Sequence, residues 1–277
     1  MPFRKIDAQL PIFQETKEKH KDFYENFVSY ADMLTKASGK ASKKSGKASS
    51  YARYLIRFII LYEEYFQQDV PSLHTFHTVK QLERLTILDG FQPYNKDEKH
   101  FPSAAFGCYR SYVTHLHTLE DDIPEIDAKQ HDTVYEQSVN YDILIESPTK
   151  KPKKLQESAG SRYPRNKNEY SAAKNRTQYI CEMDDSHTTF LVEGSLKPYI
   201  EGHHLIPMAA QDYFDYTIDF ADNIVTLCPT CHRKIHYATA DVKAEMLKTL
   251  FNQRAALYPK YGIAVTPKLL ESFYGII

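Results

Sequence analysis

The chain contains no apolar run approaching the ~20 residues that a membrane-spanning helix requires. Its longest apolar stretch, residues 55–61, is interrupted by Arg57 and flanked by charged residues. The first residues also lack the apolar core of a secretory signal peptide. We therefore expect a protein with no membrane segment that works in the cytoplasm.

Cysteine is scarce, with four residues among 277. In a chain expected in the cytoplasm, so few cysteines argue against a disulfide framework. Cys181, Cys228 and Cys231 fall in one histidine-rich segment, which favours metal binding. Cys108 lies in an apolar stretch and is expected to be a small buried side chain.

The chain has almost no net charge, because 35 basic and 36 acidic residues nearly cancel to −1. The total gives no sign of a nucleic-acid partner, but the distribution is uneven. Residues 36–47 carry five lysines and no acid, residues 120–146 carry nine acids against one lysine, and residues 148–178 carry nine basic residues against two acids. Each basic stretch is either solvated chain or a phosphate-binding surface. On the second interpretation, the candidate contacts are Lys40, Lys43, Lys44, Lys47 and Arg165.

The distribution of apolar residues predicts an α+β protein with two domains. Helical spacing predicts helices at 15–36, from Ser49 or Ser50 to about 67, at 72–88 and at 102–118, so residues 1–119 are expected to form an all-helical domain. Residues 120–160 are expected to be a charged linker, with a possible strand at 134–145. Residues 161–277 form the second domain, which ends in helices at about 239–258 and 266–274 to which we assign no chemistry.

The cysteines predict a structural zinc site. Cys228-x-x-Cys231 places two thiolates on one tight turn, and Cys181 is the obvious third ligand. The fourth ligand is open between Asp184 and His187. We favour His187, because imidazole is a better ligand than carboxylate in a cysteine-rich site.

The histidines predict a second, catalytic metal site. Residues 199–207 favour a strand that stops at Pro207, residues 223–228 favour a second strand, and a helix begins at residue 229. Neighbouring strand residues point to opposite faces, so His203 and His204 are expected to do different work unless the strand ends there. His232 and His236 share one helical face. A strand hairpin packed on that helix would bring His203 to them, and three imidazoles with open positions suit a catalytic divalent ion.

This segment resembles the HNH endonuclease family, the ββα-metal nucleases. The resemblance covers about residues 163–262, and its core is Glu201-Gly-His-His-Leu-Ile-Pro followed by Asn223-Ile-Val-Thr-Leu-Cys-Pro-Thr-Cys-His-Arg-Lys-Ile-His. The chain lacks the first Cys-x-x-Cys pair of the zinc-bearing pattern, and this departure leaves the fourth zinc ligand open.

The resemblance implies a role for each residue of the motif. His204 corresponds to the general base, and Asn223 to the residue that orients the catalytic loop by hydrogen bonding. His203, His232 and His236 correspond to ligands of a catalytic Mg²⁺ or Mn²⁺, while Zn²⁺ has a structural role. The implied products carry a 5′-phosphate and a 3′-hydroxyl.

The expected function is a metal-dependent endonuclease acting on double-stranded DNA, with a restriction or defence role and a DNA-binding or specificity role for the N-terminal domain. Arg233 is a further candidate phosphate contact, although an exposed helix charge is the simpler interpretation. Cutting a palindrome would favour a homodimer. The alternative is a non-catalytic, zinc-stabilised nucleic-acid-binding protein, and a self-contained toxin nuclease is less favoured because of the large N-terminal domain.

Overall fold

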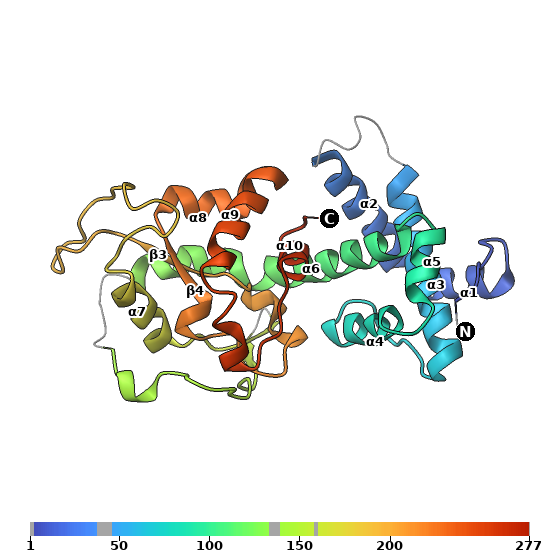
Figure 1. Cartoon of the computed structure of the whole chain (residues 1–277), viewed down its shortest axis with the longest axis horizontal. Helices are drawn as coiled ribbons and strands as arrows, with labels where there is room; N and C mark the ends of the chain where they lie inside the picture. The colour runs from blue at the N-terminus through green and yellow to red at the C-terminus, as the bar shows by residue number, and fades with distance from the viewer. Residues whose placement is uncertain (1–2, 38–45, 133–138, 158–159, 277) are drawn as a thin grey trace. The chain divides into compact units, whose positions relative to one another are not determined.

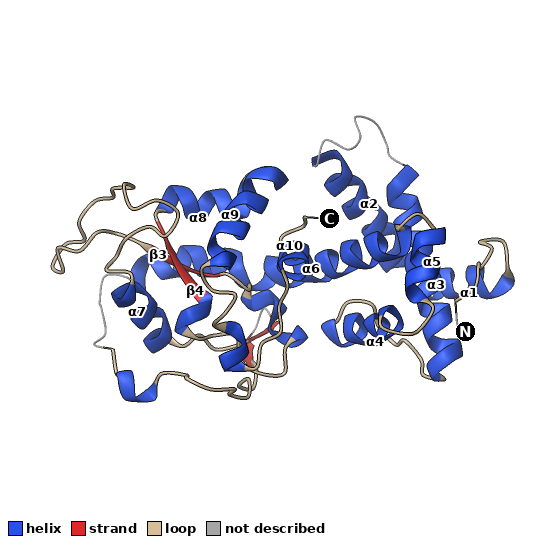
Figure 2. Ribbon diagram, in the orientation of Figure 1, coloured by secondary structure: helices blue, strands red, loops and turns tan. Residues whose placement is uncertain are grey.

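The computed structural model describes residues 3–37, 46–132, 139–157 and 160–276, and the chain divides into two compact units. The first consists of Met1–Leu116 with Gly275–Ile277, and the second of His117–Tyr274. Helices dominate the chain and strands are few and short (Figures 1 and 2). The expected fold class therefore holds in outline, as a mostly helical chain with two small sheets. The domain boundaries at 119 and 160 stay predictions.

All regular elements described in the first unit are helices. They are α1 (Pro11–Lys19), α2 (Lys21–Ala37), α3 (Gly46–Phe66), α4 (Phe76–Thr86), α5 (Phe91–Asp97) and the first part of α6 (Phe101–Asp132). Aromatic side chains form much of the core, and the ring of Phe23 meets those of Tyr109 and Tyr112 edge-on at centroid distances of 5.8 and 5.2 Å. Among the described residues, no helix is both long and apolar enough to cross a membrane.

Several predicted boundaries are wrong. The helix expected at 15–36 is two helices separated at His20, which is buried and has non-helical dihedrals (φ −117°, ψ 27°). The break lets both α1 and α2 pack against α3. Helix α5 was not predicted, and α6 continues past the expected end at 118 to Asp132, into the first part of the expected linker. The possible strand at 134–145 falls partly outside the described residues, and Tyr141–Ile143 forms a 3₁₀ turn, η1.

The second unit contains both two-stranded sheets. Strand β1 (Leu155–Glu157) pairs with β2 (Gly160–Arg162), and β3 (Glu201–His204) pairs antiparallel with β4 (Ile224–Leu227). The register sets His203 opposite Val225 and His204 opposite Ile224. The other elements are α7 (Lys167–Arg176), η2 (Met208–Tyr213), η3 (Ala221–Asn223), α8 (Pro229–Tyr237), α9 (Ala240–Asn252), η4 (Tyr258–Tyr261) and α10 (Pro267–Phe273).

The strands β3 and β4 pack against two helices, α7 and α8. Helix α8 begins directly after β4, with Pro229 in its first turn, where a missing amide proton is harmless. Gly202 allows α7 to approach β3, because a β-carbon there would lie 2.3 Å from the ring of Tyr170. The amide of Gly202 donates to the Tyr170 hydroxyl at 3.0 Å. This close contact fixes β3 against α7.

Candidate functional site

The second unit contains two groups of side chains that converge closely enough to bind a metal ion. One group is Cys181, His187, Cys228 and Cys231, and the other is His203, His232 and His236. Within each group, the donor atoms all lie within 4.8 Å of one another. The structure thus brings together every residue that the sequence predicted for the two metal sites.

The cysteine group has the spacing of a tetrahedral zinc site. His187 Nδ1 lies 3.7 Å from the Cys228 sulfur and 3.5 Å from the Cys231 sulfur. Zinc–sulfur and zinc–nitrogen bonds of ordinary length separate the two ligand atoms by about 3.5 Å at the tetrahedral angle. Burial, together with the neighbouring Cys181 and Cys228, raises the pKa of the Cys231 thiol to about 12. A divalent cation is therefore what would stabilise these sulfurs as thiolates.

The two candidates for the fourth ligand occupy different positions. His187 lies against the thiols, whereas Asp184 is exposed and its carboxylate lies 3.7 Å from Nε2, the ring nitrogen of His187 remote from the sulfurs. The Asp184 carboxylate instead accepts hydrogen bonds from the amide and hydroxyl of Ser186. The geometry thus associates His187, and not Asp184, with the three cysteines.

The histidine triad is formed by β3 and α8. His232 and His236 lie one turn apart on α8, and their Nε2 atoms are 3.2 Å apart. His203 comes from β3, with its ring centroid 5.1 Å from that of His232 and 4.7 Å from that of His236. Two nitrogens bound to one ion at ordinary distances lie about 3.0–3.4 Å apart. The observed spacing fits shared coordination.

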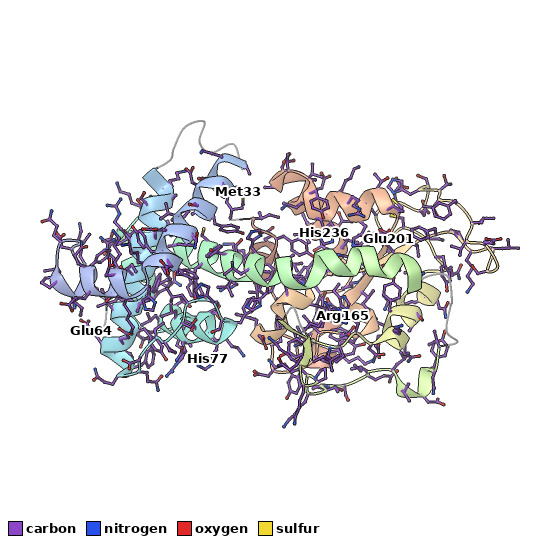
Figure 3. All side chains as sticks on the ribbon, turned by 180° about the vertical axis from the view of Figure 1, so that it is seen from behind. Met33, Glu64, His77, Arg165, Glu201 and His236 are labelled. Atoms are coloured by element: carbon purple, nitrogen blue, oxygen red, sulfur yellow. The ribbon has the colours of Figure 1, made fainter. Side chains whose placement is uncertain are left out.

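Charged neighbours influence the protonation of the triad, and Figure 3 labels two of the residues concerned, Glu201 and His236. Burial, followed by the charges of His232 and Arg233, lowers the pKa of His236 to about 3, so its lone pair is available at neutral pH. His232 Nδ1 lies 2.7 Å from a carboxylate oxygen of Glu201. Burial alone would raise the pKa of Glu201, but the contacts with His232 and Tyr199 and the charge of Arg233 together make the net shift downward. The ionised carboxylate accepts the Nδ1 proton, which leaves Nε2 of His232 for a metal.

His204 contacts an acid of its own outside the triad. Its Nε2 lies 2.8 Å from Asp219, and the two residues are only 7% and 5% exposed. The second oxygen of Asp219 accepts from the amide of Asn166 at 2.6 Å. Burial opposes ionisation of Asp219, yet the hydrogen bond and charge of His204 lower its pKa below the ordinary value. As a carboxylate, Asp219 accepts the Nε2 proton and leaves Nδ1 of His204 as the nitrogen that can take up a proton.

Asn223 connects the segments that carry His204 and Asp219. Its side chain is fully buried, and the amide nitrogen donates to the carbonyls of Ile206 and Ile218 at 3.0 and 2.8 Å. The amide oxygen accepts from the Ile206 amide at 2.9 Å and from the Tyr258 hydroxyl at 3.1 Å. Both donors and both acceptor positions are used, so this side chain has little freedom to turn.

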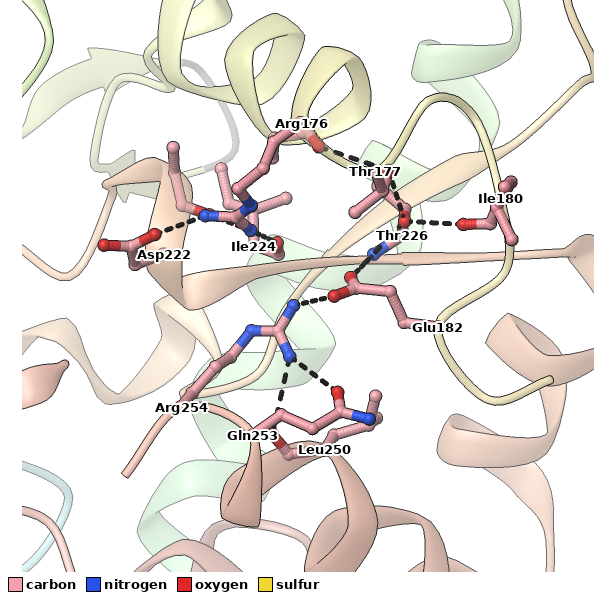
Figure 4. A network of polar contacts seen from close by, with 12 residues as sticks. Arg176, Thr177, Ile180, Glu182, Asp222, Ile224, Thr226, Leu250, Gln253 and Arg254 are labelled. Carbon is pink, nitrogen blue, oxygen red and sulfur yellow. Dashed lines mark hydrogen bonds and ion pairs between the residues drawn. The ribbon is translucent and has the colours of Figure 1, made fainter. Parts of the chain in front are cut away.

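A second polar network holds β4 in place (Figure 4). Glu182, the residue after Cys181, accepts from the amide of Thr226 at 2.6 Å and forms a short ion pair with Arg254. The Thr226 hydroxyl donates to the carbonyl of Ile180 at 2.9 Å. Strand β4 is thereby linked both to the cysteine site and to the residues that follow α9.

The predicted DNA contacts are spread over the chain. Lys40, Lys43 and Lys44 lie outside the described residues, and Lys47 is exposed near the start of α3 in the first unit. Arg233 is exposed on α8, and Arg165 lies close enough to Asp219 to lower its pKa. Only Arg165 and Arg233 therefore belong to the unit that contains both metal groups.

Three residues of the site were not assigned by sequence reasoning. Glu201 stands in the quoted motif without a role, Asp219 lies in an unremarkable loop, and the hydroxyl of Tyr274 is 2.7 Å from His203 Nε2. Glu201 could have been suggested by its position two residues before His203, since alternate strand residues share a face. Nothing in the sequence pattern singles out Asp219 or Tyr274.

Comparisons with known proteins agree with the location of the site. Residues 188–238 match the family model described as HNH endonuclease. A curated relative, the type IV methyl-directed restriction enzyme EcoKMcrA of Escherichia coli (strain K12), is 37% identical over 75 residues, which cover 27% of this chain and 25% of the relative. The chain therefore matches about a quarter of the relative's length, and no solved structure matches it significantly. The predicted resemblance of the C-terminal domain to restriction-type HNH endonucleases is confirmed.

Proposed function

We propose that this chain is a metal-dependent endonuclease that hydrolyses phosphodiester bonds in double-stranded DNA. One observation carries the proposal: three imidazoles that can share an ion lie beside a fourth imidazole, His204, which has its own carboxylate. The HNH family match over residues 188–238 supports it. In this proposal β3, β4 and α8 form the ββα-metal motif of the nuclease.

His203, His232 and His236 would hold the catalytic cation. Their donor set of neutral imidazoles suits a transition metal better than Mg²⁺, which prefers oxygen ligands, so of the two predicted ions we favour Mn²⁺. The bound ion would neutralise charge on the phosphate and stabilise the departing 3′ oxygen. Glu201 would accept a hydrogen bond from the Nδ1 proton of His232, so that the lone pair on Nε2 is available to bind the cation.

His204 would act as the general base. Among side chains, imidazole is the usual general base for taking a proton from water near neutral pH. In the proposed step, Nδ1 of His204 takes the proton of the attacking water while Asp219 stabilises the resulting imidazolium through Nε2. Asp219 is thus a positioning residue, and Asn223 holds both segments in register through its four hydrogen bonds.

The cysteine group would hold a structural zinc ion with the ligands Cys181, His187, Cys228 and Cys231. A closed set of four protein ligands leaves no open position for substrate, which is typical of structural sites. The ion would join the segment before β3 to the start of α8. It would therefore stabilise the region that supplies His232 and His236.

We further propose a role in restriction or defence, because the curated relative is named a methyl-directed restriction enzyme. Arg165 and Arg233 would contact phosphates near the site, and the first unit, with Lys47, would help to hold or choose the DNA. Homodimer formation and a cytoplasmic location stay predictions.

Plasmid cleavage tests the proposal. We expect the purified chain to cut plasmid with Mn²⁺ or Mg²⁺, and to lose activity in EDTA. His204→Ala should lower the rate by about 10²–10⁴-fold, the usual contribution of a general base, while DNA binding in a gel-shift assay persists. His77→Ala, which changes an exposed histidine of α4, is the matched control and should cut normally. Methylated and unmodified plasmids compared side by side test the restriction role.

The alternative function, a non-catalytic zinc-stabilised nucleic-acid-binding protein, gives the opposite result in the same assay. Such a protein would retard DNA in the gel without cutting it in any metal. The triad and the His204–Asp219 pair argue against it, because a structural module has no need of a second, open metal site or of a buried base with its own acid.

A further inference from the structure

We propose that Tyr274 is a positioning residue for the metal site: its hydroxyl fixes the ring and the tautomer of His203, so that Nδ1 is the nitrogen left to bind the cation. This inference rests on the proposed metal role of His203. It gives a role at the metal site to the C-terminal helical segment, for which the sequence predicted no chemistry.

Hydrogen-bond geometry around the Tyr274 hydroxyl carries the argument. The hydroxyl oxygen lies 2.7 Å from His203 Nε2, 2.8 Å from the carbonyl oxygen of Leu205 and 3.4 Å from that of His204. A hydroxyl has one proton to donate, and a carbonyl can only accept. Leu205 is fully buried, and a buried carbonyl without a donor is costly, so the proton of Tyr274 is directed to Leu205.

The tautomer of His203 follows from this assignment. With its proton on Leu205, the Tyr274 oxygen can only accept, and Nε2 of His203 must therefore carry a proton. A neutral imidazole protonated at Nε2 has its lone pair on Nδ1. The opposite tautomer would require Tyr274 to donate to His203 and would leave the Leu205 carbonyl without this donor.

The fold anchors Tyr274 from two directions. Helix α10 is capped by Thr266, whose hydroxyl accepts from the amide of Leu269 at 3.2 Å, and it buries Leu269, Leu270 and Phe273. At the end of this helix, the ammonium group of Lys243 on α9 donates to the backbone carbonyl of Tyr274 at 3.0 Å. The backbone of Tyr274 is thus held by Lys243 of α9 and, through its amide, by the carbonyl of Glu271 in α10 at 3.0 Å.

Two ligands of the triad then have separate hydrogen-bond partners of different chemistry. Glu201 is an ionised acceptor on Nδ1 of His232, and Tyr274 is a neutral acceptor on Nε2 of His203. Partners of this kind set ring orientation and ligand basicity, and their loss typically costs 10–100-fold in metal affinity. A neutral phenol orients His203 without adding a second buried negative charge beside Glu201.

The test compares Mn²⁺ binding in the full-length, zinc-loaded protein and in two tyrosine variants. Tyr274→Phe keeps the ring but removes the hydroxyl, and we expect Mn²⁺ affinity by calorimetry to fall by about 10–100-fold with zinc content unchanged. Tyr261→Phe is the matched control, because it removes a phenol bonded to Asp222 away from the triad and should leave Mn²⁺ affinity intact. Nitrogen-15 spectra of the metal-free protein should give protonated Nε2 on His203 in the wild type and mixed tautomers in Tyr274→Phe.

The outcomes separate this inference from the proposed nuclease function. Mn²⁺ binding that depends on His203 but not on Tyr274, or a wild type with Nδ1 protonated, overturns the inference and leaves the nuclease proposal standing. Mn²⁺ binding that depends on both residues, in a protein that cuts no DNA, supports the inference and rejects the nuclease. If the variant His203→Ala binds Mn²⁺ as tightly as the wild type does, the inference is overturned as well.

Discussion

The substitution Asp219→Asn examines the proposed base most directly, because it alters one atom of a buried pair. Asp219 accepts from His204 Nε2 through one oxygen and from the Asn166 amide through the other. An asparagine has only one oxygen, so one of these two partners must face an NH₂ group. The substitution therefore either weakens the contact to His204 or reverses it.

The magnitude follows from the two possibilities. If the asparagine oxygen stays on His204, the loss is that of a charge-assisted hydrogen bond, about 1.5–3 kcal/mol. At 1.36 kcal/mol per tenfold, this corresponds to about 10- to 160-fold in rate. If the NH₂ group turns to His204, the ring must protonate Nδ1 and loses its function as a base. The loss then extends toward the ~10⁴-fold that the same change produces in the serine-protease triad.

Steady-state cleavage of a duplex at saturating Mn²⁺ measures the effect. We expect kcat to fall while KM and Mn²⁺ affinity stay constant, because Asp219 is buried and is not a member of the histidine triad. Asp215→Asn, which changes an exposed acid four residues earlier, is the matched control and should keep full activity. A folded Asp219→Asn protein with wild-type kcat would refute the assignment of His204 and Asp219 as a catalytic pair.

Three further predictions concern stability. Cys181→Ser should remove most of the bound zinc and lower the unfolding temperature. Asp184→Ala, by contrast, should retain one zinc per chain, as measured by elemental analysis. Equal zinc loss in the two variants would contradict the proposed ligand set. Burial opposes ionisation of Asp212, but its contacts with neighbouring lysines and a tyrosine lower its pKa. Its stabilising effect, about 0.5–1 kcal/mol, is therefore complete above about pH 4 and disappears as the pH falls through the lowered value. Urea titrations at pH 3 and pH 7 should show this loss in the wild type and a smaller one in Asp212→Asn. Arg254→Met should cost up to about 3 kcal/mol, because it removes the ion-pair partner of the Glu182 carboxylate, whose side chain is only 16% exposed. Glu182→Gln in that background should restore part of the loss in the same titrations.

The two groups of candidate metal ligands could be anticipated because their geometry is local. A Cys-x-x-Cys turn brings two sulfurs together in any sequence that forms the turn. His232 and His236 share a face of α8 through helical periodicity alone. The opposite environments of His203 and His204 likewise follow from the twofold repeat of a strand. These inferences require only a few residues of chain around each side chain.

The remaining parts of the site depend on contacts between distant segments. Asp219 reaches His204 across fifteen residues, and Tyr274 reaches His203 across seventy-one. Spacing carries no information about such pairs, because any of the acids or tyrosines in the domain could have served. The same limit explains why α7 and β1–β2 were missed, since each is short and has little periodicity of its own.

The register of β3 places the histidine proposed to bind metal and the histidine proposed to transfer a proton in different surroundings. A slip of one residue would exchange the environments of His203 and His204, because each step along a strand turns the side chain to the other face. Three contacts on the strand oppose such a slip. Gly202 lacks the β-carbon that would clash with the Tyr170 ring, and Glu201 is hydrogen-bonded to His232. Asn223 is hydrogen-bonded to the amide and the carbonyl of Ile206, just beyond the strand. In the proposed mechanism, the residues that flank the two histidines therefore determine which imidazole binds a cation and which is left to accept a proton.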